Sequence, residues 1–292
     1  MSPWLLWTLL AVVCWGLWAV VSKLIGEALT PAQSQALSTI GILPILVLFV
    51  GRRGERSGRH RMRGIQAAVA AGVLTCLGNV TYYALLRNGK AATVVPLTAV
   101  YPIVTVVLAL LFLHERLNAT QCFGIILSLA AIYLFNVQSA LGISVAGILL
   151  VLAPIVLWGV AALMQKIATN YIDGETATAW FLAAFVPVGI VLLWIEPLAT
   201  SPGMRGWLLT FALGFTFALG NLALLFAFAR DGKASVITPL AGLYPIVSIP
   251  VAILLFGERI GSRETMAILC ALAGVTAVSW PSPQPNVAKA TV

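Results

Sequence analysis

Long apolar runs without charge alternate with short charged or polar segments along this chain. A membrane-spanning helix needs about 20 apolar residues, so the charged residues mark where each span ends. Uncharged runs that predict spans lie at 1–22, 28–51, 64–86, 91–113, 176–195, 206–229, 234–257 and 265–288. A further 49 uncharged residues between Arg116 and Lys166 are too many for one crossing, and the polar stretch 136–144 divides them into two. The pattern predicts an all-α integral membrane protein with ten transmembrane helices.

The composition agrees with a bilayer environment. The 292 residues are 61% hydrophobic and 9% charged, and the mean hydropathy is +1.02, whereas soluble domains carry about 25% charged residues. On a soluble protein, the net charge of +8 would suggest binding to nucleic acid. Here the basic residues lie between apolar runs, where they determine topology. We therefore expect no nucleic-acid partner, and we expect the first apolar run to be a retained helix because it lacks a basic segment before it.

The basic residues also predict the orientation. The loop "GRRGERSGRHRMRG" at 51–64 carries six arginines, and loops rich in Lys and Arg stay in the cytoplasm. With this loop inside, 11 basic residues lie on the cytoplasmic side and 6 on the other. Ten crossings place both ends of the chain together. We expect a multi-pass protein of the cell inner (cytoplasmic) membrane with both termini cytoplasmic.

Part of the sequence occurs twice. "KAATVVPLTAVYPIVTVVLALLFLHERL" at 90–117 aligns without a gap with "KASVITPLAGLYPIVSIPVAILLFGERI" at 233–260, 143 residues later, with 12 identities in 28 positions. "CWGLWAVVSK" at 14–23 and "LWGVAALMQK" at 157–166 are separated by the same offset. The repeat divides the ten predicted helices into two sets of five, and an odd number gives the second set the opposite orientation.

We therefore predict a first five-helix repeat at 1–140 and a second five-helix repeat with a short cytoplasmic tail at 141–292. A 5+5 inverted-topology repeat around a central cavity is typical of secondary transporters. Two inverted halves can pack in two ways of similar energy, one open to each side of the membrane. Exchange between these two packings is alternating access.

The repeated segments contain prolines near the middle of two predicted spans. Pro102 and Pro245 each follow a tyrosine at equivalent positions. Proline removes a backbone donor, which membrane helices tolerate beside a cavity or beside groups that satisfy the freed carbonyl. One interpretation is a simple packing kink. We favour a cavity wall or hinge, and we predict that Pro102 and Pro245 are hinge residues.

Polar and aromatic residues within the spans are candidates for lining the cavity. Thr75, Asn79 and Tyr82 share one helix face at i, i+4 and i+7. Such residues either join helices by hydrogen bonds or line a cavity, and the tryptophans either pack in the core or form an aromatic wall. The mildly polar, neutral set suits a neutral or zwitterionic solute. The substrate-binding candidates are Trp15, Trp18, Thr75, Asn79, Tyr82, Tyr83, Thr98, Tyr101, Trp158, Asn221 and Tyr244.

Charged residues inside the spans are scarce. All nine acidic residues fall at loops or helix ends, whereas an intramembrane carboxylate is the usual proton relay and cation partner. This disfavours proton-coupled export of cationic drugs and leaves facilitated export open. Lys23 and Lys166 end two spans at equivalent positions. They are either partners for a substrate carboxylate or anchors that reach toward the membrane surface.

No set of residues indicates catalysis or metal binding. His60 and His114 lie in or beside loops, and no span pairs histidines or carboxylates. The four cysteines fall in apolar runs without metal-ligand spacing, at Cys14, Cys76, Cys122 and Cys270. We expect neither enzymatic activity nor a metal or cofactor.

These motifs resemble those of the drug/metabolite transporter superfamily, in particular the ten-helix EamA-type exporters. The resemblance rests on the Trp-Gly-…-Lys segments, the Pro-Leu-…-Tyr-Pro segments and the Glu-Arg pairs at 115–116 and 258–259. Among characterised members the chain is similar to the YddG-type amino-acid exporters. The resemblance implies a basket-like bundle, a central cavity lined by helices 1, 3, 4, 6, 8 and 9, and efflux of small metabolites.

We therefore expect a secondary transporter that exports small metabolites, in particular amino acids, by alternating access. Its expected partners are the small-molecule solute and membrane lipid, and the expected functional unit is a monomer. Export of a purine, sugar or drug remains an alternative, as does a channel or a scaffold that transports nothing.

Overall fold

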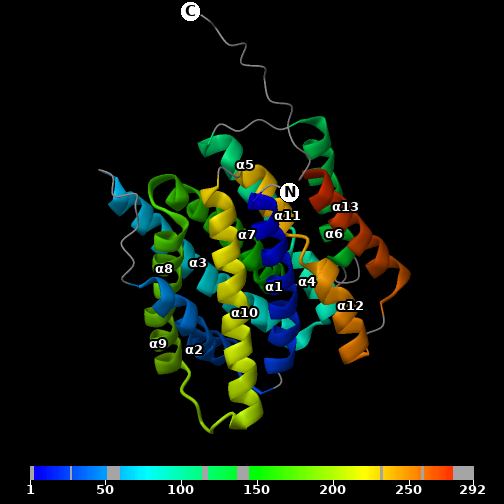
Figure 1. The fold of residues 1–292 in the computed structure, drawn as a ribbon. Helices are drawn as coiled ribbons and strands as arrows, with labels where there is room; N and C mark the ends of the chain where they lie inside the picture. Colours follow the sequence, from blue (N-terminus) through cyan, green and yellow to red (C-terminus); the bar gives the residue numbers. More distant parts are fainter. Residues whose placement is uncertain are drawn as a thin grey trace, which may run out of the picture.

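A computed structural model describes residues 3–26, 28–50, 60–113, 118–136, 145–230, 233–257 and 260–278. The secondary structure of these parts is helical throughout, and the helices pack as a bundle (Figure 1). The helices are α1 (Pro3–Ile25), α2 (Pro31–Phe49), α3 (Arg61–Asn88), α4 (Ala91–Thr98), α5 (Pro102–Phe112), α6 (Ala119–Asn136), α7 (Val145–Tyr171), α8 (Gly174–Ala183), α9 (Phe185–Ile195), α10 (Gly203–Ala229), α11 (Ala234–Ala241), α12 (Pro245–Phe256) and α13 (Ser262–Val278).

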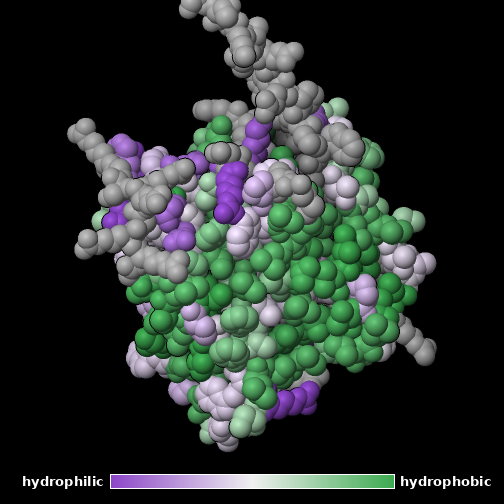
Figure 2. Space-filling view, in the orientation of Figure 1, coloured by the Kyte–Doolittle hydropathy of each residue, from purple (hydrophilic) through white to green (hydrophobic). Residues whose placement is uncertain are grey.

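The helices are long and apolar enough to cross a membrane. Within the described residues, eight helical segments meet both requirements, with mean hydropathies from 1.5 to 2.4. Figure 2 shows a broad hydrophobic surface around the middle of the bundle, with hydrophilic residues gathered toward its two ends. The protein is therefore a multi-pass membrane protein. The remaining helices α6 and α13 pack against one another at one side of the bundle (Figure 1).

Three predicted spans are broken into two helices each. The span predicted at 91–113 divides into α4 and α5, that at 234–257 into α11 and α12, and that at 176–195 into α8 and α9. Two of these interruptions fall at the predicted hinge residues Pro102 and Pro245. In the break at 99–101, Tyr101 N–H donates to Thr98 O, an i→i+3 bond that keeps the connection compact.

Pro102 and Pro245 begin new helices and do not kink continuous ones. At the first helical position the missing N–H costs nothing, because that N–H has no partner within the helix, and the fixed φ of proline favours the helical turn. The two breaks also meet one another, since a Cβ built on Gly242 would lie 3.0 Å from Cγ of Pro102 and 3.3 Å from O of Ala99.

The first helix of each predicted repeat packs into the other repeat. α1 packs mainly on α10, α11 and α12, whereas α7 packs mainly on α3 and α5. Glycines allow these close contacts. A Cβ on Gly16 would lie 2.5 Å from Cβ of Val247, and a Cβ on Gly159 would lie 2.5 Å from Cβ of Val104. Small residues at such crossings are typical of membrane helices.

Several predicted features lie outside the described residues. They are the division between the repeats at 140–141, most of the polar stretch 136–144, most of the arginine-rich loop, the Glu-Arg pairs and His114. The predicted last span ran to residue 288, whereas α13 is described to Val278.

Candidate functional site

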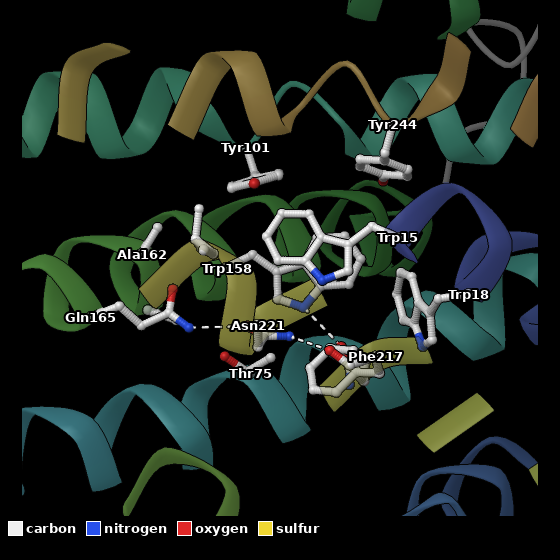
Figure 3. A pocket seen from close by; sticks show the side chains of 13 residues that line it. Trp15, Trp18, Thr75, Tyr101, Trp158, Ala162, Gln165, Phe217, Asn221 and Tyr244 are labelled. Carbon is white, nitrogen blue, oxygen red and sulfur yellow. Dashed lines mark hydrogen bonds between the residues drawn. The ribbon is translucent and has the colours of Figure 1, made fainter. Parts of the chain in front are cut away.

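A pocket lies between six of the predicted spans. It has about 450 Å³ of empty volume, including space open to solvent. Its walls come from α1, α3, α7 and α10, together with the residues that directly precede α5 and α12. These are the spans that the resemblance to EamA-type exporters implied. The lining residues, shown in Figure 3, are Trp15, Trp18, Thr75, Asn79, Tyr101, Trp158, Ala161, Ala162, Gln165, Phe217, Asn221, Leu224 and Tyr244.

Six of the thirteen lining residues are aromatic. Trp158 lies edge-on to Trp18, with ring centroids 5.8 Å apart, and to Tyr101 at 6.0 Å. Trp15 lies edge-on to Tyr244 at 6.4 Å. The lining residues include no charged side chain. The pocket therefore offers apolar surface with a few neutral polar groups, as small-molecule sites commonly do.

Three hydrogen bonds fix the amide side chains of the pocket. Trp158 Nε1 donates to Asn79 Oδ1 at 3.1 Å, and Gln165 Nε2 donates to Asn221 Oδ1 at 3.0 Å (Figure 3). Asn221 Nδ2 donates to the carbonyl of Phe217 at 3.0 Å. These bonds tie α7 to both α3 and α10 at the pocket.

Three other donors in the pocket have no partner within the described structure. They are Trp15 Nε1, Asn79 Nδ2 and the Tyr101 hydroxyl. The exposed fractions of these residues are 9%, 1% and 4%. A buried donor without an acceptor costs free energy, because it has lost its bonds to water. These atoms are enclosed in the observed conformation, so a solute would bond to them only after neighbouring side chains move.

Eight of the eleven sequence-predicted residues line this pocket. The other three are buried outside its lining. Tyr82 stacks on Trp18 with centroids 4.9 Å apart, and Tyr83 accepts a hydrogen bond from Trp18 Nε1 at 3.2 Å. Thr98 donates to the carbonyls of Val94 and Val95. A role for these residues in binding solute stays a prediction.

Sequence reasoning missed five lining residues. Ala161, Ala162 and Gln165 follow Trp158 at i+3, i+4 and i+7, which is the spacing of one helix face. Phe217 and Leu224 flank Asn221 at i−4 and i+3. The same periodicity that selected Thr75 and Asn79 would have found all five.

The two lysines at the span ends lie outside the pocket lining. Lys23 Nζ donates to the carbonyls of Leu86, at 2.8 Å, and Gly89, at 2.7 Å. Lys166 Nζ donates to the carbonyl of Phe228 at 3.5 Å. These carbonyls lie at the C-terminal ends of α3 and α10, where a cation is favourable. Both lysines therefore join helices, a role that neither sequence interpretation included.

A membrane-spanning helical bundle with a pocket between interrupted helices is the architecture of a solute transporter. The model of the EamA-like transporter family matches this chain at residues 2–137 and 145–280. The chain therefore belongs to the EamA-like transporter family, which is a family of transporters and not of enzymes.

Two further comparisons found similar proteins. An uncharacterized protein of Methanocaldococcus jannaschii is 29% identical over 131 residues, which cover 45% of this chain and 94% of that protein. A crystal structure of another protein aligns with a TM-score of 0.71 and 18% identity, covering 94% of this chain and 98% of that one. The structural likeness concerns the fold alone.

Proposed function

We propose that this protein exports amino acids across the cytoplasmic membrane by alternating access. The observation that carries the substrate class is the lining of the pocket, which combines six aromatic rings with amides and hydroxyls and includes no charged side chain. Apolar and aromatic walls suit the side chain of an amino acid. Neutral donors and acceptors suit a zwitterion, which carries no net charge.

The proposed architecture is ten spans arranged as a 5+5 inverted repeat. It is supported by the two family matches, which begin 143 residues apart, the same offset as the repeated motifs. The M. jannaschii relative supports it too, because almost the whole of that protein aligns with less than half of this chain. α6 and α13 would supply the fifth span of each half.

Alternating access is supported by unequal contacts at equivalent positions. Thr105 Oγ1 donates to the carbonyl of Gly159 at 2.9 Å, which joins α5 to α7. The equivalent hydroxyl, on Ser248, has no partner in the described structure, although Gly16 packs on Val247 as Gly159 packs on Val104. We propose that the second conformation makes the bond at Gly16 and breaks the one at Gly159.

The proposed location is the inner membrane with both termini in the cytoplasm. The beginning of α1, the beginning of α3 and the end of α13 lie toward the same end of the bundle in Figure 1. Arg61 and Arg63 begin α3 at that end, which favours its placement on the cytoplasmic side. We propose that a single chain is the functional unit, since the pocket is built from one chain.

Counterflow in proteoliposomes tests this function. Vesicles containing the protein are loaded with each of the twenty amino acids in turn, and entry of the same labelled amino acid is measured. Saturable accumulation that requires internal amino acid is expected for at least one of them. Uptake without exchange or saturation would indicate a channel, and no uptake of any amino acid would exclude this substrate class.

A further inference from the structure

We propose that Trp15, Asn79 and Tyr101 form a donor set that binds a hydrogen-bond acceptor of the solute, either a carboxylate or a carbonyl oxygen. The inference rests on the proposed function of the pocket as a solute site. It assigns the residues that recognise one end of the solute, and it requires no cationic side chain to hold a carboxylate.

The three donors are all buried, and none of them has a partner within the described structure. Each belongs to a residue that lines the same pocket, and each comes from a different part of the fold: α1, α3 and the break before α5. All three residues are at least nine-tenths buried, so water in bulk does not satisfy them. Native proteins pair most buried donors. Of the ten buried side-chain polar atoms without a partner among the described residues, these three belong to residues that line the pocket, and this coincidence supports a ligand with acceptors there.

The second argument comes from the equivalent residues of the other repeat. Trp158 and Tyr244 lie 143 residues after Trp15 and Tyr101, and Asn221 lies 142 after Asn79. In this second set every donor is satisfied by the protein. Trp158 Nε1 donates to Asn79 at 3.1 Å, Asn221 Nδ2 to Phe217 O at 3.0 Å, and the Tyr244 hydroxyl to Val95 O at 3.4 Å. The donor atoms of the same three residue types are thus paired in one repeat and unpaired in the other.

Gln165 explains how Trp15 stays unpaired. By analogy with the bond from Trp158 to Asn79, Trp15 Nε1 would donate to Asn221 Oδ1. Gln165 Nε2 donates to that oxygen at 3.0 Å and occupies one of its two acceptor positions. The residue equivalent to Gln165 in the first repeat is Ser22, whose hydroxyl donates to its own helix at Trp18 O. We propose that Gln165 is a positioning residue, which holds the Asn221 amide in an orientation that leaves the Trp15 donor free.

The chemistry of the pocket defines the acceptor. Hydrogen bonds from neutral N–H and O–H groups to a carboxylate are charge-assisted and stronger than neutral ones. A neutral carbonyl would accept the same bonds with less energy. Because the lining residues include no carboxylate, a solute that has an ammonium group but lacks the acceptor would lose these bonds and gain no ion pair.

The first test varies the ligand and leaves the protein unchanged. Binding to the purified protein is measured for L-leucine, L-methionine and L-phenylalanine, for their amides, and for isopentylamine, 3-(methylthio)propylamine and phenethylamine, which lack the carboxyl group. We expect each amine to bind about 10- to 100-fold more weakly than its amino acid, the range for losing hydrogen bonds to a charged acceptor. An amide that binds as its acid does would identify a carbonyl as the acceptor and also support the proposal.

The outcomes separate this inference from the proposed function. If an amino acid and its amine bind equally well, the donor set does not recognise an acceptor, while amino-acid transport stands. If none of the nine compounds binds and none of the twenty amino acids exchanges, the proposed function fails and the donor set fails with it.

The second test compares matched variants. Tyr101→Phe removes an unpaired hydroxyl, whereas Tyr244→Phe removes the equivalent hydroxyl that is already bonded to Val95 O. We expect Tyr101→Phe to weaken binding of the amino acid about 10-fold and to leave binding of its amine unchanged. Tyr244→Phe should change the affinity for the amino acid and the affinity for its amine by the same factor. An equal effect of both variants on the ratio of acid to amine affinity would overturn the proposal.

The positioning role of Gln165 has its own readout. Gln165→Met leaves Asn221 Oδ1 free to accept from Trp15 Nε1, which removes one donor from the set. The ratio of acid to amine affinity should then fall about 5- to 10-fold, whereas loss of a merely structural contact would weaken both ligands alike. An unchanged ratio would show that Gln165 does not control the Trp15 donor.

Discussion

α1 and α7 begin the two predicted repeats and cross the bundle at equivalent positions, yet their contacts differ. α7 is bonded to α3 through Trp158 and Asn79, and to α5 through Gly159 and Thr105. Neither equivalent bond exists at α1. Trp15 Nε1 on α1 and the Ser248 hydroxyl on the neighbouring α12 have no partner within the described structure. Each helix nevertheless has a glycine at the crossing, with a neighbouring valine at the same 2.5 Å from its Cβ position. The backbone packing is nearly symmetric, and the hydrogen bonds are not.

The unequal hydrogen bonds at α1 and α7 indicate that a small difference in free energy is enough to exchange two conformations. A single intramolecular hydrogen bond contributes about 1 kcal/mol, and a bias of about 1–3 kcal/mol changes a two-state population by roughly 5- to 150-fold. If the second conformation makes two such bonds at α1 and breaks the two at α7, the conformations differ little in free energy, and removal of one bond would give a bias of that order. Exchange of these bonds between the helices, with the glycine crossings retained, would convert one conformation into the other.

The largest expected effect comes from the crossing of α7 and α5. A Cβ on Gly159 would lie 2.5 Å from Cβ of Val104 and 2.9 Å from Tyr101 O, so Gly159→Ala must move the two helices apart. We expect a loss of about 1–3 kcal/mol of stability, the usual cost of overpacking, and transport reduced at least 10-fold. Thermal unfolding in detergent and counterflow measure the two effects.

Gly26→Ala is the matched control for that variant. Its Cβ would make only ordinary contacts, at 3.5 Å or more, so stability and transport should stay near wild type. If Gly159→Ala is equally harmless, the crossing of α7 and α5 is not closely packed, which would contradict the equivalence of the α1 and α7 crossings.

A smaller effect is expected from the hydroxyls at the same crossings. Thr105→Val keeps the shape of the side chain but removes the bond to Gly159 O. The observed conformation should lose about 1 kcal/mol, which is about a fivefold shift toward the other one. Ser248→Ala removes the bond that only the second conformation would make, so it should shift the population the opposite way.

Accessibility of a cysteine placed in the pocket, probed from each side of the membrane, measures both shifts. Ala161→Cys in an otherwise cysteine-free protein provides the probe, since Ala161 lines the pocket. Shifts in the same direction for Thr105→Val and Ser248→Ala would contradict the exchange of bonds.

Lys23 should affect stability but not recognition. Lys23→Gln removes a cation from the last carbonyls of α3, where it makes two bonds. We expect a loss of about 0.3–1 kcal/mol in thermal unfolding and an unchanged affinity for amino acids. A tenfold loss of affinity would instead favour the interpretation of Lys23 as a partner for a substrate carboxylate.

The smallest effect is expected from the prolines. Because Pro102 is the first residue of α5, Pro102→Ala restores an N–H that no bond within the helix requires. The break should persist through its i→i+3 bonds, and transport should change less than about threefold. A much larger loss of counterflow would show that the proline itself forms the hinge, as the sequence alone suggested.

The sequence predicted the apolar spans well because length and charge decide which segments enter a bilayer. It did not predict the breaks at 99–101 and 242–244, because a proline is compatible both with a kinked helix and with the start of a new one. The face of α3 that carries Thr75 and Asn79 was predictable from spacing. The bond from Gln165 to Asn221 was not, because the choice between Gln165 and Trp15 as donor depends on tertiary packing.

Alternating access by exchange of bonds between the α1 and α7 crossings can be tested with two matched pairs of spin labels on the outer surface. Val13 on α1 and Leu254 on α12 are exposed, and their equivalents Val156 on α7 and Leu111 on α5 are exposed too. Distances within each pair are measured by pulsed electron spin resonance in lipid nanodiscs, with and without amino acid. If the two crossings exchange their bonds, each pair shows two distances, with the α1–α12 distance shortening in the population in which the α7–α5 distance lengthens. A single unchanged distance in both pairs, or changes of the same sign, would contradict this exchange.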